Sequence, residues 1–153
     1  MTSNAQALAS SIFEWPLRVY IEDTDAGGIV YYVNYLKYME RARTEFMRSL
    51  GFDKRFIFNV DLMFVVHSVN VDYLKPARLD DELIATVEVQ RVGKAYMLMA
   101  QKVYRVDESL QPENSHQHRE LLCQGDVKLA CVDRQTIKPK RLPEQVIVML
   151  NDL

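Results

Sequence analysis

An acidic, glycine-bearing loop lies between a predicted strand and a predicted helix in the stretch Tyr20-Ile21-Glu22-Asp23-Thr24-Asp25-Ala26-Gly27-Gly28-Ile29-Val30-Tyr31-Tyr32-Val33-Asn34-Tyr35. A carboxylate in such a loop can lie beside the backbone N–H groups at the start of the helix. These groups lack intrahelical partners and carry the positive end of the helix dipole, so they favour negative charge. The stretch therefore has the composition of an active-site segment in which a base and an oxyanion site share one loop.

The chemistry that uses such a pair is attack on a carbonyl group. Asp25 would activate water or attack directly, while the backbone N–H groups from Gly28 to Tyr32 would hold the developing oxyanion. This interpretation favours acyl transfer or hydrolysis. The alternative is purely structural, because Asp and Thr before a helix are often caps and Gly-Gly is often a turn. The loop by itself leaves both interpretations open.

The apolar residues before the loop and those after it repeat with different periods. Leu17, Val19 and Ile21 have the period of a strand that leads into the loop. From Asn34 to Leu50 the apolar residues follow a helical stripe, with Asn34 as a cap and Gly51 as a stop; the stripe comprises Tyr35, Met39, Ala42, Phe46 and Leu50. Further apolar residues widen the stripe, which suits a helix wrapped by a sheet. Glu40, within this helix, is predicted to be solvated or ion-paired.

Four strand patterns follow the helix, and no second long helix is predicted. They cover residues 65–73, 83–90, 95–106 and 121–132, and Asp107–Arg119 is predicted to be a long hairpin loop. In the first of them Val65, His67 and Val69 are assigned to one face. The order of elements predicts an α+β fold, with one buried helix against a curved antiparallel sheet of about five strands. Such a sheet leaves an exposed edge, for which dimerisation is a natural solution.

Length, charge and cysteine content set the broad class. A chain of 153 residues with 48% hydrophobic residues fits one domain, predicted over residues 15–153 after a flexible tail at 1–14. The net charge of -2 gives no general attraction to nucleic acid. Neither a signal peptide nor a membrane span is indicated, so we expect a cytoplasmic protein without membrane insertion. Cys123 and Cys131 are predicted to be buried thiols on one strand, too far apart to pair.

Three blocks of sequence resemble one known family. The run from Tyr20 to Glu45 is similar to the signature of the 4-hydroxybenzoyl-CoA thioesterase-like hotdog proteins, in particular their Tol-Pal-associated branch of bacterial acyl-CoA thioesterases. Two further blocks match that branch: 71–81, and Cys131-Val132-Asp133 followed by Lys138-Pro139 and Leu142-Pro143. The resemblance covers nearly all of 17–150. It implies a hotdog fold and a homodimer or homotetramer with active sites between subunits.

The resemblance also implies roles for individual residues. Asp25 corresponds to the catalytic carboxylate, Asp23 to a residue that shapes the loop, and the backbone N–H of Tyr32 to the group that polarises the thioester carbonyl. The Tol-Pal-associated branch usually has His in place of Tyr32, but a backbone donor survives a change of side chain. The substrate-binding residues implied by the resemblance or by charge are Gly28, Ile29, Val30, Tyr31, Asn34, Lys75, Arg78, Arg91 and Lys94. The four cations among them would contact CoA phosphates, and ordinary surface charge is the alternative for each.

The predicted function is hydrolysis of an acyl-CoA thioester to a free acid and CoA, without a metal or redox cofactor. Of the three histidines, His116 and His118 give only weak support for a metal site. Asp25 as general base and Asp25 as nucleophile both fit. A hotdog dehydratase or hydratase is a second interpretation, but it would need a histidine in the critical loop. A third is a non-catalytic module that binds acyl-CoA or acyl carrier protein. The acyl group stays open, although the branch has links to acyl carrier protein and envelope lipid metabolism.

Overall fold

The computed structural model describes residues 12–59, 61–109 and 118–153. Its helices and strands, in chain order, are β1 (Phe13–Arg18), the 3₁₀ turn η1 (Ile21–Asp23), α2 (Val33–Ser49), α3 (Lys54–Asn59), β2 (Leu62–Tyr73), β3 (Glu82–Val92), β4 (Tyr96–Val106), β5 (Arg119–Asp133) and α4 (Glu144–Asn151).

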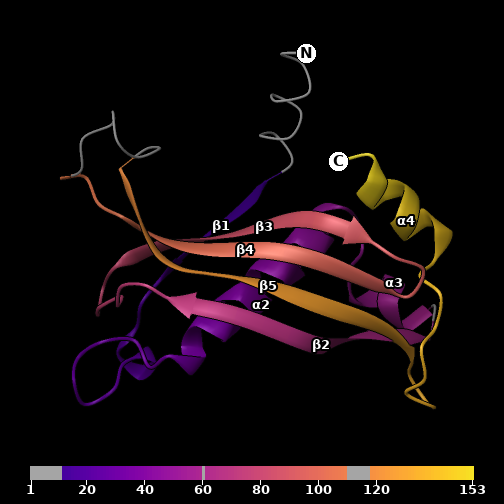
Figure 1. Cartoon of the computed structure of the whole chain (residues 1–153), viewed down its shortest axis with the longest axis horizontal. Helices are drawn as coiled ribbons and strands as arrows, with labels where there is room; N and C mark the ends of the chain where they lie inside the picture. The colour runs from indigo at the N-terminus through magenta and orange to yellow at the C-terminus, as the bar shows by residue number, and fades with distance from the viewer. Residues whose placement is uncertain (1–11, 60, 110–117) are drawn as a thin grey trace.

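The five strands form one antiparallel sheet in the order β1-β3-β4-β5-β2. The long helix α2 lies behind this curved sheet in Figure 1 and packs on β1, β3 and β4. β2, the first strand after the helices, forms one edge of the sheet, and β1 forms the other. The predicted α+β architecture, with a central helix and a curved antiparallel sheet of about five strands, is confirmed.

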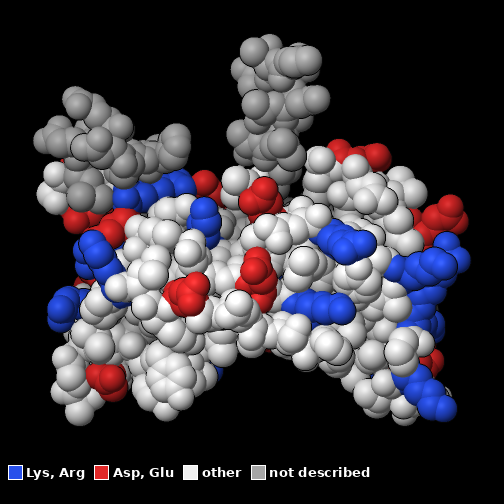
Figure 2. Space-filling view, in the orientation of Figure 1, with Lys and Arg blue, Asp and Glu red and all other residues white. Residues whose placement is uncertain are grey.

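The core lies between α2 and the helix-facing side of the sheet. Tyr38, Met39 and Ala42 are fully buried, as are Met97 and Met99 on β4. The predicted stripe of α2 is therefore confirmed for its central residues, and burial of its broad apolar face stabilises the helix against the sheet. The opposite face of the sheet is mostly uncharged, with acidic and basic side chains scattered over it (Figure 2).

The structure corrects the predicted start of the domain and the first strand. β1 begins at Phe13, so Phe13 and Glu14 pair with β3 instead of belonging to a tail. Ile21 lies in the 3₁₀ turn η1 and is exposed. Residues 1–11 of the predicted tail and 110–117 of the predicted hairpin loop lie outside the described residues.

The alternation assigned to β2 is also corrected. The strand starts at Leu62, and an irregularity between Val66 and Ser68 changes the register with β5. Val65 consequently lies opposite Ala130, while Val69 lies opposite the buried Val127 on the helix-facing side. A strict period of two therefore failed because one extra residue is inserted in the strand.

Two short helices were not predicted. α3 follows α2, and its Phe56 ring packs against that of Phe52 at 4.9 Å. α4 follows Pro143 and buries Val146 and Leu150 against the core. Among the described residues, no helix is both long and apolar enough to cross a membrane. Cys123 and Cys131 are buried free thiols.

Candidate active site

The loop that contains Asp25 is closed by its own backbone. Thr24 and Val30 form a bridge, the Asp25 N–H donates to the carbonyl of Ile29 at 3.0 Å, and the Gly28 N–H donates to the carbonyl of Asp25 at 3.0 Å. Gly28 has a φ of +79°, a conformation that side chains disfavour, which explains glycine at this position. The Asp25 carboxylate is exposed, and its Oδ1 accepts the Gly27 N–H at 2.8 Å. No described residue donates a hydrogen bond to Oδ2, which leaves this oxygen available.

A second segment holds the loop from outside. The Val30 N–H donates to the carbonyl of Ala77 at 2.9 Å, and Ile29 forms a bridge with Arg78. The Ala77 N–H in turn donates to the hydroxyl of Tyr35 on α2 at 2.9 Å. The loop, the segment before β3 and the first turns of α2 are therefore joined by hydrogen bonds that run through the centre of the site.

Asp23 is held inside the same loop. It is 9% exposed, and its Oδ2 accepts the Tyr20 N–H at 2.9 Å. Its backbone carbonyl accepts the Tyr31 N–H at 2.9 Å and the side-chain amide of Asn34 at 2.8 Å. Burial, with a contribution from Asp23, raises the pKa of the Tyr38 phenol well above its ordinary value. Asp23 thus contacts the loop and the helix start, whereas the Asp25 carboxylate faces solvent.

The start of α2 supplies unpaired backbone donors. Tyr32 is the residue before the helix, and the Asn34 and Tyr35 N–H groups already donate to the carbonyls of Tyr31 and Tyr32. The N–H groups of Tyr32 and Val33 donate to no described residue. They therefore stand at the positive end of a 17-residue helix as the groups best placed to bind an anionic oxygen.

The structure reduces the number of loop N–H groups that are available to bind an oxyanion. The N–H groups of Gly28, Val30 and Tyr31 are occupied by bonds within the loop and its support. Asn34 is buried in the first turn of α2 and its amide nitrogen donates to the Asp23 carbonyl, so it does not cap the helix. Of the predicted oxyanion donors, Tyr32 combines a helix-start position with an N–H that no described residue occupies.

Tyrosine rings extend from the helix start to the end of β2. The Tyr32 ring, 57% exposed, contacts the rings of Tyr31 and Tyr73 at centroid distances of 5.0 and 6.0 Å. Tyr73 also contacts Tyr35 at 5.6 Å. Sequence analysis did not assign Tyr73 to the site, because only its place at the end of a strand pattern marked it. Together these rings form an apolar wall with polar tips beside the Asp25 loop.

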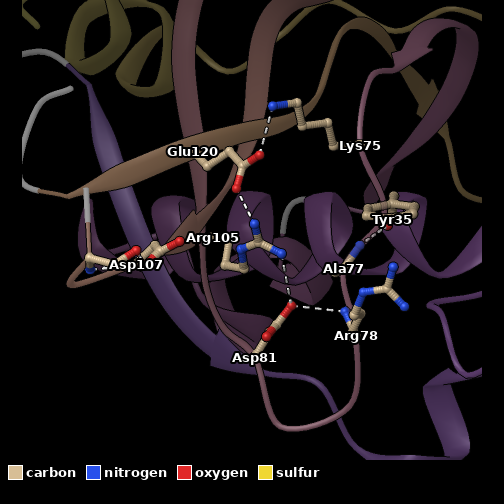
Figure 3. A network of polar contacts seen from close by, with 9 residues as sticks. Tyr35, Lys75, Ala77, Arg78, Asp81, Arg105, Asp107 and Glu120 are labelled. Carbon is tan, nitrogen blue, oxygen red and sulfur yellow. Dashed lines mark hydrogen bonds and ion pairs between the residues drawn. The ribbon is translucent and has the colours of Figure 1, made fainter. Parts of the chain in front are cut away.

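Two of the four predicted phosphate-binding cations lie near this loop. Lys75 Nζ contacts Glu120 at 2.9 Å, and Glu120 also binds Arg105, whose other nitrogen lies 3.7 Å from Asp81 (Figure 3). Arg78 uses its backbone N–H to contact Asp81 at 2.8 Å, while its guanidinium extends away from that carboxylate (Figure 3). The Lys75 hydrogen bond is the main cause that holds the pKa of Glu120 below its ordinary value.

Arg91 and Lys94 lie at the other end of β3. Asp81 and Arg78 precede the strand, whereas Arg91 is near its end and Lys94 is in the following turn, where its carbonyl accepts the Leu142 N–H at 2.8 Å. At about 3.3 Å per residue, the strand separates the two pairs of cations by about 30 Å. Within one chain they cannot bind the same phosphate group. In residues 12–59, 61–109 and 118–153 no group of three or more His, Cys, Asp or Glu side chains could hold a metal ion.

Comparison with known proteins identifies the family of this chain. Residues 27–111 match the family described as the thioesterase superfamily. The chain is 40% identical over 135 residues to the acyl-CoA thioesterase YbgC of Haemophilus influenzae, covering 88% of this chain and 90% of the relative. It is 35% identical over 138 residues to the acyl-CoA thioester hydrolase YbgC of Escherichia coli, covering 90% and 95%.

A solved structure shares the fold. The 1,4-dihydroxy-2-naphthoyl-CoA thioesterase from Synechocystis matches with a TM-score of 0.78 over 93% of this chain and 97% of that one, at 22% identity. The chain belongs to the thioesterase superfamily and has the hotdog fold of its structural neighbours. It is a thioester hydrolase.

Proposed function

We propose that this protein hydrolyses acyl-CoA thioesters, with Asp25 as general base or nucleophile and the Tyr32 N–H as the oxyanion donor. The observation that carries the proposal is the pairing of an exposed, oriented carboxylate with an unoccupied helix-start N–H on one clamped loop. The names of the relatives, which describe acyl-CoA thioesterases, support the choice of substrate.

In the proposed reaction the thioester carbonyl accepts a hydrogen bond from the Tyr32 N–H. Asp25 removes a proton from a water molecule, the water oxygen bonds to the carbonyl carbon, and negative charge develops on the carbonyl oxygen. The carbon–sulfur bond then breaks, and the departing CoA sulfur takes up a proton. Alternatively an Asp25 oxygen bonds to the carbonyl carbon, the carbon–sulfur bond breaks and the CoA thiolate leaves, which forms a mixed anhydride that water then hydrolyses. The Gly27 N–H, which holds one carboxylate oxygen, orients the other in either route.

CoA would enter over the segment that supports the loop. Arg78 is the better candidate for a phosphate contact, because its guanidinium has no ion-pair partner among the described residues, whereas Lys75 is paired with Glu120. Arg91 and Lys94 would contribute only from a second subunit. An acyl carrier protein as a partner remains an expectation from the resemblance, and a cytoplasmic location remains an expectation from the sequence.

The exposed edge strand supports a homo-oligomer as part of this proposal. Val66 and Val69, on the helix-facing side of β2, are 52% and 44% exposed. An edge with unpaired backbone groups and apolar side chains is commonly covered by another chain. We propose that a second copy pairs along β2, next to Tyr73, so that the site lies close to the subunit boundary.

Release of free thiol from short-chain, long-chain and aromatic acyl-CoAs tests the proposal directly. Asp25→Asn keeps the size of the side chain but removes its negative charge, so we expect turnover to fall by about 10² or more. Glu22→Gln, which neutralises an exposed acid of the same loop, is the matched control and should stay near wild type. A folded Asp25→Asn protein with near-normal turnover would overturn the assignment.

A further inference from the structure

A groove runs along α2 where the helix leaves β2 uncovered. A cavity of about 790 Å³ lies between α2, α3 and β2, lined mainly by apolar side chains such as Met47, Phe58 and Phe64. A smaller cavity of about 140 Å³ lies nearer the helix start, lined by Val33, Leu36, Val69 and others. The two cavities share the lining residues Glu40, Arg43 and Val66, so they adjoin each other along α2, and we refer to them together as the groove.

One residue that lines the smaller cavity, Val33, is the chain neighbour of the proposed oxyanion donor Tyr32. Val33 follows Tyr32 directly and belongs to the first turn of α2. At 1.5 Å per residue, Arg43 lies about 15 Å further along the helix axis. An extended chain advances about 3.5 Å for every three backbone bonds, so a path of this length corresponds to roughly a dozen bonds. An acyl chain whose thioester lies at Tyr32 is therefore long enough to reach Arg43 along the smaller cavity. Its wall combines apolar side chains with the charged Lys37 and Glu40.

Arg43 is the cation at the junction of the two cavities, and Gln101 fixes its position. Arg43 Nη1 donates to Gln101 Oε1 at 2.8 Å. Gln101 is 1% exposed, and its Nε2 donates to the carbonyls of Met39 at 3.0 Å and Thr86 at 3.2 Å. Because both carbonyls require the amide nitrogen, the amide oxygen must face Arg43. The guanidinium is thus held in place by a neutral partner.

The remaining donors of Arg43 are unused by the described residues. A guanidinium has five N–H donors, one of which binds Gln101, and no described carboxylate lies within 4 Å of the others. Glu40, one turn earlier, is exposed; its charge acts on Arg43 without a direct ion pair. A cation in such an apolar groove is stabilised by an anion that forms charge-assisted, bidentate hydrogen bonds.

We propose that Arg43 binds a carboxylate at the distal end of the acyl group, so that the groove selects acyl-CoA thioesters whose chain carries a second acid group. This inference rests on the proposed function and deepens it by naming a substrate class. In this proposal Leu36, Val66 and Val69 contact the methylene chain, and the guanidinium that Gln101 holds binds the terminal carboxylate.

The test compares two CoA thioesters of equal length, one with a terminal carboxylate and one with a terminal methyl group. In Arg43→Gln we expect kcat/KM for the carboxylate substrate to fall about 10- to 100-fold, as for loss of a hydrogen-bonded charge. The methyl-terminated substrate should be hydrolysed at the wild-type rate or faster. Arg41→Gln removes the same charge from the exposed side of α2 and should leave the ratio of the two substrates unchanged.

Glu40→Gln provides a second test, which remains valid even if Arg43→Gln fails to fold. Glu40→Gln removes an exposed negative charge beside the groove, so it should raise kcat/KM for the carboxylate substrate by a few-fold. An unchanged substrate ratio in both variants overturns the inference while hydrolysis itself persists. Dissociation of an oligomer by Arg43→Gln in light scattering also overturns it, because the guanidinium then binds a second copy. Absence of hydrolysis of every acyl-CoA by the wild type would instead reject the proposed function.

Discussion

At the scale of the residue, the two acids of one loop have opposite surroundings. Asp23 is nearly buried and its oxygens accept hydrogen bonds from Tyr20, Tyr31 and Asn34, while Asp25 is exposed. We expect Asp23→Asn to lower the free energy of unfolding by about 1–2 kcal/mol, because the amide replaces a charged acceptor. Its loss of turnover should be much smaller than that of Asp25→Asn. Urea unfolding measured beside thiol release checks this, and a larger catalytic loss in Asp23→Asn would reverse the assignment of the two acids.

Substitutions of Tyr32 distinguish a catalytic role of its backbone N–H from a role of its side chain. If its N–H binds the carbonyl oxygen, Tyr32→Phe and Tyr32→His should each keep much of the turnover, because the helix start retains its geometry. The ring packs against Tyr31 and Tyr73, so acyl preference and apparent affinity should change. Activity on short, long and aromatic acyl-CoAs, with melting temperature as control, tests this. Loss of all turnover in a stable Tyr32→Phe protein would assign catalysis to the phenol hydroxyl.

At the scale of the element, one ionic network joins β5, β4 and the segment that supports the active-site loop. The Lys75 hydrogen bond lowers the pKa of Glu120, so the unfolded chain takes up this proton at a higher pH than the folded chain. The stabilisation is complete above the ordinary Glu value of about 4.3 and is lost as the pH falls through the lower folded pKa.

Glu120→Gln should therefore make the free energy of unfolding less dependent on pH below about pH 5. At neutral pH it should lower the free energy of unfolding by only about 1 kcal/mol, because Lys75 is largely exposed. Denaturant unfolding as a function of pH measures both effects. Glu108→Gln, an exposed acid with no contact to this network, serves as the control. An unaltered acid dependence in Glu120→Gln would show that the network does not contribute to stability.

Comparing the predicted helices and strands with the observed ones shows which features the sequence could predict and why other features were missed. Period and flanking turns identified α2 and the strands, because burial of one face enforces those periods. The extra residue near His67 in β2 gave no signal in single-sequence alternation. Asn34 has the chemistry of a cap, yet its amide binds the Asp23 carbonyl from within the helix, a contact set by tertiary structure. α4 had a readable signal in Pro143 followed by Val146 and Leu150 at helical spacing.

At the scale of the whole molecule, the edge strand β2 connects the candidate active site with the exposed surface of the domain. Among the described strands its backbone pairs with β5 alone, its helix-facing Val66 and Val69 are exposed, and its last residue, Tyr73, contacts Tyr32. The same uncovered face forms one wall of the groove that leads away from the helix start. A monomer would leave this wall in water, whereas pairing along β2 would bury apolar area and place a second chain beside the catalytic loop.

We therefore expect light scattering to give a multiple of the chain mass. Val69→Asp places a charge on the face that the second chain would cover, so it should dissociate the oligomer and reduce turnover together. Ser68→Asp, the neighbouring residue on the opposite face of the strand, adds the same charge and should leave both properties near wild type. Because Val69 also lines the smaller cavity, the decisive measurement is turnover at rising protein concentration: recovery of turnover together with the oligomer links completeness of the site to assembly. A Val69→Asp protein that is monomeric, folded and fully active would show that one chain holds the whole site.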